Sequence, residues 1–264
     1  MARRARLDAE LVRRGLARSR EHAAALIAGG RVKVAGTVAT KPATAVEAGT
    51  PVLVEAEPGD QWVSRGAHKL LGALAAFGVD PSGRRCLDAG ASTGGFTEVL
   101  LRGGAAHVVA VDVGYGLIAW SLRTDERVTV VERVNARNLE PSQVGEAASL
   151  VVADLSFIPL GLVLPALVRC ATPDADLLPM VKPQFEVGRE NLPAGGVVRD
   201  PTARADAVRR VATQATALGL GVQGVTASPL PGPSGNVEYF LHLRRGAPPL
   251  EEAALRRAVE EGPQ

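Results

Sequence analysis

The sequence predicts a small basic α+β domain followed by a larger α/β domain with a mostly parallel sheet, and three observations support this. Residues 1–41 hold ten Lys or Arg against three acids, so this segment is strongly basic in a chain whose net charge is only +2. From about residue 64, short apolar segments alternate with helical patterns, as in a doubly wound sheet. A glycine-rich turn over residues 90–95 follows the first of those segments.

Length and composition limit the number of domains and the class of protein. A chain of 264 residues suits one large domain or a small and a medium one. At 46% hydrophobic it can build a core, mostly of Ala, Val and Leu because aromatic residues make up only 3%. No apolar stretch reaches 18 residues and no signal peptide is visible, so we expect a cytoplasmic protein. Cys86 and Cys170 lie in apolar segments without metal-ligand spacing, so we expect buried thiols and no metal.

The first domain is expected to contain two helices, over residues 7–14 and 20–28, and short strands over 31–38 and 50–54. Ser19 is a plausible N-cap of the second helix, and Gly29-Gly30 ends it. Basic residues concentrated in one part of a chain suggest contact with nucleic acid, although a solvated face is the simpler alternative. The candidate RNA-binding residues are Arg6, Arg14, Arg18, Arg20, Lys33 and Lys41.

The segment from Ser19 to Gly36 carries the pattern Ser-Arg-x-x-Ala-x-x-x-Ile-x-x-Gly-x-Val-x-Val-x-Gly. This pattern resembles the core of the S-four domain, an RNA-binding domain of a small-subunit ribosomal protein and of several enzymes that modify rRNA and tRNA. The resemblance implies an RNA-binding domain over residues 1–58. We expect a linker over 59–64 and the second domain over 65–264.

The second domain reads as a Rossmann-like α/β unit with seven strands. The predicted strands cover residues 85–89, 107–113, 127–132, 149–154, 176–182, 221–227 and 237–243, with helices over 95–103, 160–169, 202–218 and 250–262. The last two strands are separated by a segment rich in Pro and Gly, which favours an antiparallel pair at the sheet edge.

The segment from Asp88 to Thr97 predicts a cofactor site between a strand and a helix. Glycines at 90, 94 and 95 allow a tight turn and a close approach of the backbone to a ligand. The acid before Gly90 and the wide gap after it depart from the dinucleotide pattern, and S-adenosylmethionine has a cationic ammonium and sulfonium instead of a pyrophosphate. We therefore expect S-adenosylmethionine, with a dinucleotide or a purely structural turn as the alternatives.

Two further positions extend this site. Asp112 ends the next strand, 22 positions beyond Gly90, where a carboxylate can bind ribose hydroxyls. Asn135 follows the third strand, where contacts with adenine usually lie. The candidate cofactor-binding residues are Asp88, Gly90, Ser92, Gly94, Gly95, Phe96, Asp112 and Asn135.

Charged residues at the ends of other predicted elements indicate the chemistry. Enzymes that methylate base amines typically carry an Asn/Asp-Pro-Pro-aromatic loop after the fourth strand, whereas this sequence has Asp154-Leu-Ser-Phe there, so we expect a target other than an amine. Lys182 ends an apolar strand, where a lysine is costly to bury. Lys69 and Glu238, taken singly, would be ordinary surface charges.

Together these motifs resemble the TlyA family, known both as haemolysin A and as rRNA 2′-O-methyltransferase, with an FtsJ-like methyltransferase half. The resemblance rests on Val-Ser-Arg-Gly-Ala-His-Lys-Leu, Leu-Asp-Ala-Gly-Ala-Ser-Thr-Gly-Gly-Phe-Thr, Val-Asp-Val-Gly-Tyr-Gly and Val-Lys-Pro-Gln-Phe-Glu. It implies a catalytic tetrad of Lys69, Asp154, Lys182 and Glu238. One departure is Asp60, where some relatives carry an arginine two residues before the Trp-Val pair.

The resemblance implies methylation of a cytidine ribose in 23S rRNA within ribosomal subunits. Longer members of the family also modify 16S rRNA, and because this chain has the basic N-terminal segment and both helices, we expect both targets. Lys182 could act as a general base when neutral or stabilise a developing oxyanion when charged. A haemolysin and a non-catalytic ribosome-assembly factor remain the alternatives. No protein partner or membrane contact is expected.

Overall fold

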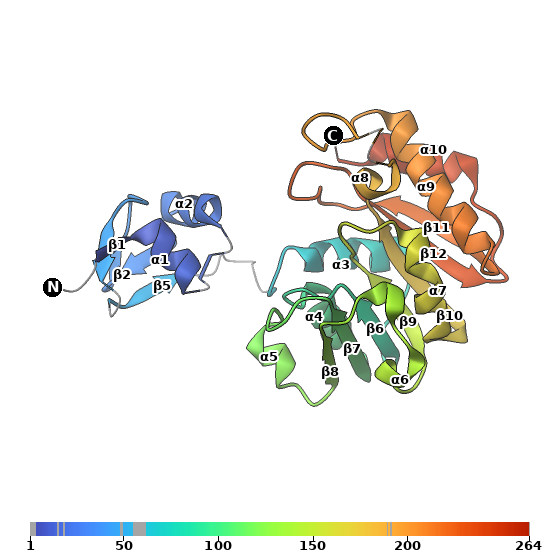
Figure 1. Ribbon diagram of the computed structural model, residues 1–264, viewed down its shortest axis with the longest axis horizontal. Helices are drawn as coiled ribbons and strands as arrows, with labels where there is room; N and C mark the ends of the chain where they lie inside the picture. Colours follow the sequence, from blue (N-terminus) through green and yellow to red (C-terminus); the bar gives the residue numbers. More distant parts are fainter. Residues whose placement is uncertain are drawn as a thin grey trace. The chain divides into compact units, whose positions relative to one another are not determined.

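The computed structural model describes residues 4–14, 16–17, 19–47, 50–54, 62–188, 190 and 192–263. The chain divides into two compact units, Met1–Gln61 and Trp62–Gln264 (Figure 1). Residues 59–61 of the predicted linker lie outside the described ranges, and so does Asp60. Residues 62–64 belong to the second unit, so the predicted boundary stays a proposal.

The first unit packs two helices against small antiparallel sheets. Its elements are β1 (Arg4–Arg6), α1 (Leu7–Arg13), α2 (Arg20–Ala28), β2 (Val32–Val34), β3 (Thr37–Val38), β4 (Ala45–Glu47) and β5 (Val52–Val54). Strand β1 pairs with β4, and β2 pairs with both β3 and β5. The helices bury Leu7, Leu11 and Ile27 in one core with Val32. The Ser19 hydroxyl accepts a hydrogen bond from His22 N at 3.1 Å, which confirms the predicted cap.

The second unit contains one seven-stranded sheet. Its strands are β6 (Arg85–Ala89), β7 (His107–Asp112), β8 (Val128–Glu132), β9 (Ala148–Ala153), β10 (Ala171–Val181), β11 (Leu220–Ala227) and β12 (Tyr239–Arg245). Their order is β11-β12-β10-β9-β6-β7-β8. Strand β12 is antiparallel to both of its neighbours, and the other adjacent pairs in this sheet are parallel. The predicted α/β class and the antiparallel pairing of the last two strands are therefore confirmed, with β11 at the edge and β12 inside it.

Helices cover both faces of this sheet (Figure 1). The helical elements described in this unit are α3 (Gly66–Phe77), which precedes the first strand, α4 (Gly95–Arg102), α5 (Trp120–Arg123), η1 (Ala136–Asn138), α6 (Pro141–Val144), η2 (Leu160–Leu162), α7 (Leu164–Arg169), α8 (Pro183–Glu186), α9 (Pro201–Thr216) and α10 (Glu252–Glu261), which follows the last strand. No helix in the described ranges is both long and apolar enough to cross a bilayer.

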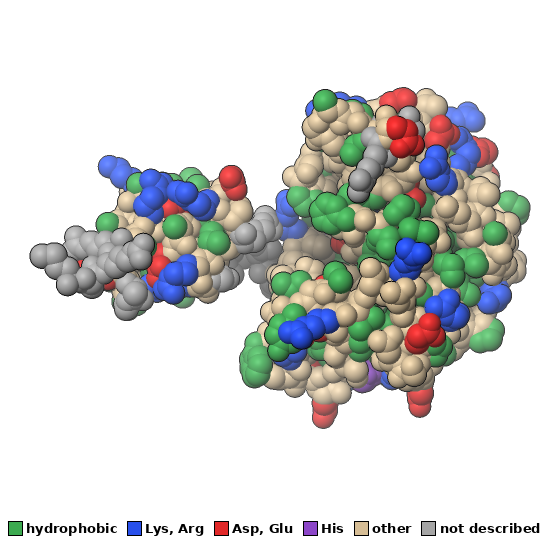
Figure 2. Space-filling view, in the orientation of Figure 1, with side chains coloured by type: hydrophobic (Ala, Val, Ile, Leu, Met, Phe, Trp, Pro, Cys, Tyr) green, Lys and Arg blue, Asp and Glu red, His purple; other side chains and the backbone are tan. Residues whose placement is uncertain are grey.

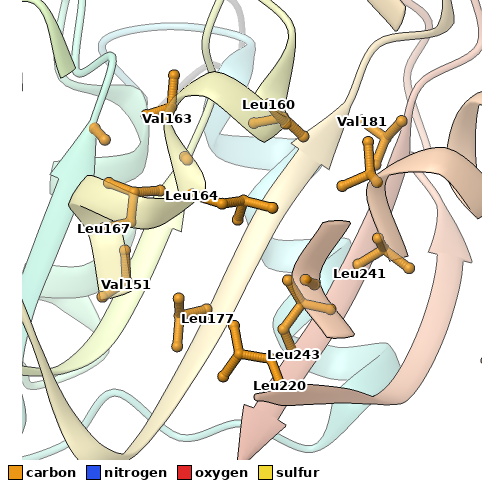
Figure 3. Packing of buried hydrophobic residues seen from close by; sticks show 14 of the residues in the cluster. Val151, Leu160, Val163, Leu164, Leu167, Leu177, Val181, Leu220, Leu241 and Leu243 are labelled. Atoms are coloured by element: carbon orange, nitrogen blue, oxygen red, sulfur yellow. The ribbon is translucent and has the colours of Figure 1, made fainter. Parts of the chain in front are cut away.

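Alternation along the strands separates two cores. In β7, Val108 and Ala110 lie in a core with residues of α3 and α4, whereas Val109 and Val111 lie in a core with residues of α7, α9 and α10. Figure 3 shows part of the second core, where leucine and valine side chains of the sheet meet those of the covering helices. Because both faces are buried, the strands read as continuous apolar runs.

Two element predictions differ from the structure. The strand predicted over 176–182 begins at Ala171, because Ala171 pairs with Ala148 of β9 ahead of a register shift that ends at Asp176. The helix predicted over 160–169 is divided into η2 and α7, and Pro165 lies in the first turn of α7, where its missing N–H costs no hydrogen bond. Several short elements, such as β1 and β4, were not predicted because three residues carry too little periodicity.

Candidate active site

The ends of four neighbouring strands meet at one edge of the sheet. Ala89, the last residue of β6, pairs with Ala153, the last residue of β9, which in turn pairs with Pro179 of β10. Val181, at the end of β10, pairs with Tyr239, at the start of β12. This edge therefore places the residues that follow β6, β9 and β10 beside the residue that precedes β12.

Lys69 and Glu238 form a buried ion pair. Lys69 lies in the first half of α3, and Glu238 directly precedes β12. The Nζ–Oε2 distance is 2.5 Å, and the side chains are 10% and 1% exposed. Glu238 Oε1 is also buried and has no hydrogen-bond partner among the described residues. One oxygen of Glu238 thus holds the lysine, and the other keeps its acceptor capacity.

A second pair joins Lys182 and Asp154, which follow the neighbouring strands β10 and β9. Lys182 Nζ lies 2.6 Å from Asp154 Oδ1, and it donates a hydrogen bond to Ser156 Oγ at 2.9 Å. The side chains of Lys182 and Asp154 are 9% and 23% exposed. The four residues of the predicted tetrad therefore lie at one sheet edge, as two lysine–carboxylate pairs.

The glycine turn packs tightly against this edge. Gly90 has a φ of 89°, and a Cβ there would overlap the backbone carbonyl oxygen of Asp154. Gly94 has a φ of 99°, and a Cβ there would overlap the Leu122 side chain. These glycines are therefore required by the left-handed backbone and by contacts within the protein. The turn holds the ends of β6 and β9 together beside Asp154.

Asp88 is fully buried beneath the turn. Its Oδ2 accepts a hydrogen bond from Thr97 Oγ1 at 2.7 Å, and its Oδ1 has no partner among the described residues. Burial, together with the smaller effects of the negative charges of Asp154 and Asp112, raises the pKa of Asp88 to about 7, although the hydrogen bond from Thr97 opposes the shift. Asp88, Asp112 and Asp154 lie close enough to interact electrostatically, and such a group of carboxyl groups favours a cationic ligand at this place.

Asp112 connects two loops at the end of β7. Its carboxylate accepts hydrogen bonds from Ser92 N at 2.8 Å and from Gly114 N at 2.6 Å. It thereby fixes the glycine turn against the loop that follows β7. Each carboxylate oxygen has a second acceptor site, so the geometry leaves capacity for hydroxyl groups.

Phe96 and Asn135, both predicted to contact the cofactor, differ in burial. The Phe96 ring is 3% exposed and packs in the core, with its centroid 6.1 Å from that of Phe240. Asn135 is exposed and its side chain caps η1 by accepting from Arg137 N at 3.0 Å. Their predicted contacts with a cofactor stay predictions.

Sequence reasoning did not single out three residues of this edge. Ser156 binds Lys182, and Thr97 binds Asp88. Phe157 is 91% exposed, has a φ of 64° and lies with its ring centroid 5.2 Å from that of Phe185. The signal that could have found them is proximity in sequence to Asp154 and to the glycine turn.

The candidate RNA-binding residues of the first unit fall into different environments. Arg14 donates from Nε to Glu10, from Nη1 to Thr50 O and from Nη2 to Glu47 O, and its side chain is only 20% exposed. Arg14 therefore connects α1 to the segment around Glu47 and Thr50 inside this unit.

The other candidates are more open. Arg6 and Arg20 are more than half exposed, and both bind Asp8. Lys41 is exposed and Lys33 is partly buried. Arg18 lies outside the described residues. Figure 2 shows Lys and Arg side chains on the visible face of this unit.

The sheet order, with the single reversed strand β12 between β10 and β11, is that of the Rossmann-like methyltransferases. Domains of this architecture bind ligands outside the carboxyl ends of their strands, and the acidic glycine turn and the two lysine–carboxylate pairs lie there. Comparison with known protein families supports the same class. Residues 62–245 match the FtsJ-like methyltransferase family, and residues 5–52 match the S4 domain.

Full-length relatives narrow this class to one family. The 16S/23S rRNA (cytidine-2′-O)-methyltransferase TlyA of Mycobacterium tuberculosis is 63% identical, with all of both chains covered. The 23S rRNA (cytidine-2′-O)-methyltransferase TlyA of Campylobacter jejuni is 35% identical, over 69% of this chain and 70% of its own. A solved structure named as a candidate hemolysin, from Streptococcus thermophilus, is 35% identical with a TM-score of 0.79, covering 99% of this chain and 96% of its own. The chain belongs to the TlyA family of FtsJ-like methyltransferases.

Proposed function

We propose that this chain transfers a methyl group from S-adenosylmethionine to the 2′-hydroxyl of a cytidine in rRNA. The observation that carries the proposal is the pair of lysine–carboxylate contacts at the sheet edge that also holds the acidic glycine turn. The names of the relatives from M. tuberculosis and C. jejuni support the same target.

The proposed cofactor fits the charges of the turn. When bound, S-adenosylmethionine supplies an electrophilic methyl group on a cationic sulfur. Asp88, whose buried Oδ1 has no hydrogen-bond partner in the described part of the chain, and Asp154 would favour the cationic part, and Asp112 would bind the ribose hydroxyls of the adenosine. A dinucleotide is disfavoured because its pyrophosphate would face these carboxyl groups.

The chain's own residues would orient and deprotonate the hydroxyl. Lys182 Nζ is held by Asp154 and Ser156, and from this position it would donate to the 2′-oxygen as negative charge develops there. Asp154 is the carboxylate beside it that can accept the hydroxyl proton. Lys69 and Glu238 would hold the ribose in line with the methyl group, a contribution that can reach several kcal/mol.

The first unit would bring the rRNA to this site, within ribosomal subunits. Its S4 match and the exposed arginines support an RNA contact. Dual action on 16S and 23S rRNA is favoured because the relative with 63% identity carries both names, whereas the relative with 35% identity carries only the second.

The test uses purified protein, S-adenosylmethionine with a labelled methyl group, and both ribosomal subunits from a strain that lacks the corresponding gene. A 2′-O-methyl group blocks alkaline cleavage of the adjoining phosphodiester, so a protected cytidine in the labelled rRNA is the expected result. The Lys182→Ala variant serves as the control and should give no protection. Label on a base, or no label in either subunit, would contradict the proposal.

A cytolytic function is the second candidate, because the S. thermophilus relative is named for it. Erythrocyte lysis by the purified protein, prepared free of host toxins, would support it. Equal lysis by Lys182→Ala would show that such an activity does not depend on the proposed active site.

A further inference from the structure

Two exposed arginines of the first unit are held by one buried carboxylate. Asp8 lies in the first turn of α1 and is 4% exposed, whereas the side chains of Arg6 and Arg20 are 53% and 59% exposed. Arg6 directly precedes α1, and Arg20 begins α2. The carboxylate therefore fixes two guanidinium groups that come from different elements.

The hydrogen bonds use the full acceptor capacity of Asp8. Its Oδ1 accepts from Arg6 Nε at 3.1 Å and from Ala9 N at 2.8 Å. Its Oδ2 accepts from Arg6 Nη2 and from Arg20 Nη2, both at 2.9 Å. A carboxylate offers about four acceptor sites, so none remains for a ligand. The bonds from Arg6 and Arg20 hold the pKa of Asp8 well below its usual range, which keeps the carboxylate charged.

Asp8, in contrast, uses only a minority of the N–H donors of the two arginines. A guanidinium has five N–H groups in a rigid fork that matches phosphate oxygens. Asp8 takes two of these from Arg6, which leaves three, and one from Arg20, which leaves four. Two guanidiniums and one carboxylate sum to a charge of +1, so the cluster attracts an anion.

We propose that Asp8 is the positioning residue of a two-arginine site for an RNA phosphate, in which Arg6 and Arg20 make the contacts. The inference rests on the proposed function, because it takes RNA as the ligand. Ordering a long side chain on binding weakens affinity by about twofold to tenfold. Asp8 orders both side chains during folding, so it strengthens RNA binding although its own charge repels RNA.

The Asp8→Asn variant of the full-length protein tests this directly. We expect it to bind a 23S rRNA transcript about fivefold more weakly at 0.15 M KCl, because the ordering of two side chains is lost. Coulomb's law alone predicts the opposite, since the variant removes a negative charge beside a phosphate site. Equal or tighter binding by Asp8→Asn would therefore overturn the inference.

The matched control is Glu21→Gln, which also removes one acid from the first unit. Glu21 is exposed in the first turn of α2, beside Arg20 in sequence. We expect equal or slightly tighter RNA binding by this variant. Weakening as large as that of Asp8→Asn would show that loss of any acid has this effect, and would overturn the role of Asp8.

A double-mutant cycle separates positioning from a general structural role. In the Arg6→Ala/Arg20→Ala background, Asp8→Asn should produce no further weakening, because the side chains through which it acts are gone. The same fivefold weakening in that background would count against the proposal.

Arg20→Lys keeps the test decisive if Asp8→Asn fails to fold. Arg20 is exposed, and lysine preserves its charge, but an ammonium that pairs with Asp8 cannot also offer a fixed fork. We expect most of the weakening of Arg20→Ala, and wild-type affinity would overturn the proposal. Absence of rRNA binding and methylation by the wild-type protein would instead refute the proposed function.

Discussion

Lys69 and Glu238 are 169 residues apart in the sequence, and their side chains form an ion pair of 2.5 Å in the interior of the second unit. The pair connects helix α3 with the start of the reversed strand β12. A buried charge is stabilised only while its partner is present. The contact therefore serves the stability of the domain as well as the proposed active site.

The Glu238→Gln variant should lower the free energy of unfolding by about 3–5 kcal/mol, because it leaves the Lys69 ammonium buried without a counter-charge. Urea unfolding followed by circular dichroism measures the difference. The control is Glu252→Gln, which breaks the exposed pair with Arg209 and should cost at most about 1 kcal/mol. Equal losses in the two variants would mean that Lys69 is hydrated after all.

The Lys182→Ala variant should reduce methyl transfer by roughly 10²–10³-fold, the loss typical when one donor that stabilises a developing oxyanion is removed. Single-turnover transfer to rRNA measures the chemical step, and calorimetry should show unchanged S-adenosylmethionine affinity. Ser156→Ala is the milder comparison, since Asp154 still holds the ammonium. Turnover of Lys182→Ala within about tenfold of the wild type would be too fast for the role proposed.

The Asp112→Ala variant should weaken S-adenosylmethionine binding about tenfold or more, because it removes the proposed ribose acceptor and releases Ser92 N. Isothermal titration measures the affinity. Asp125→Ala is the matched control, because Asp125 also accepts a backbone hydrogen bond near a strand end, from Arg127 N. If the two variants bind alike, Asp112 has no part in the cofactor site.

The raised pKa of Asp88 should make stability depend on pH. Between about pH 4 and pH 7 the folded state keeps the Asp88 proton, and the unfolded state, with an ordinary pKa of 3.8, has lost it. The unfolded state then binds fewer protons, so the free energy of unfolding falls as pH rises through this range. Denaturant unfolding at pH 4.5 and 7.5 should show this fall in the wild type and a smaller one in Asp88→Asn. Parallel pH profiles of the two proteins would place the titration elsewhere.

Arg14 and Lys41 should separate folding from RNA contact in the first unit. Arg14→Ala should destabilise this unit by about 1–3 kcal/mol, because Glu10 loses a charged partner and two carbonyl groups lose their donor. For comparison, Lys41→Ala should leave stability unchanged. It should reduce the slope of log binding constant against log salt concentration for RNA by roughly 0.7–0.9, if the exposed ammonium contacts one phosphate. Unchanged stability of Arg14→Ala would show that its internal contacts contribute little.

The sequence alone determined the architecture of this protein to a large extent. Strand and helix periodicity located the seven strands of the large sheet, and Ser19 marked the start of α2. The glycine turn and the charged residues after the strands could also be found, because parallel strands bring their carboxyl ends to one edge. These are local signals, so one sequence suffices to detect them.

Only the tertiary structure decided which charged groups meet. The pairing of Lys69 with Glu238 and of Lys182 with Asp154 depends on strand order, which periodicity does not specify. The internal contacts of Arg14 depend likewise on chain segments more than thirty residues away. The same side chain can brace a fold or bind a ligand, and its neighbours in space determine which, because charge–charge and hydrogen-bond energies act over a few ångströms.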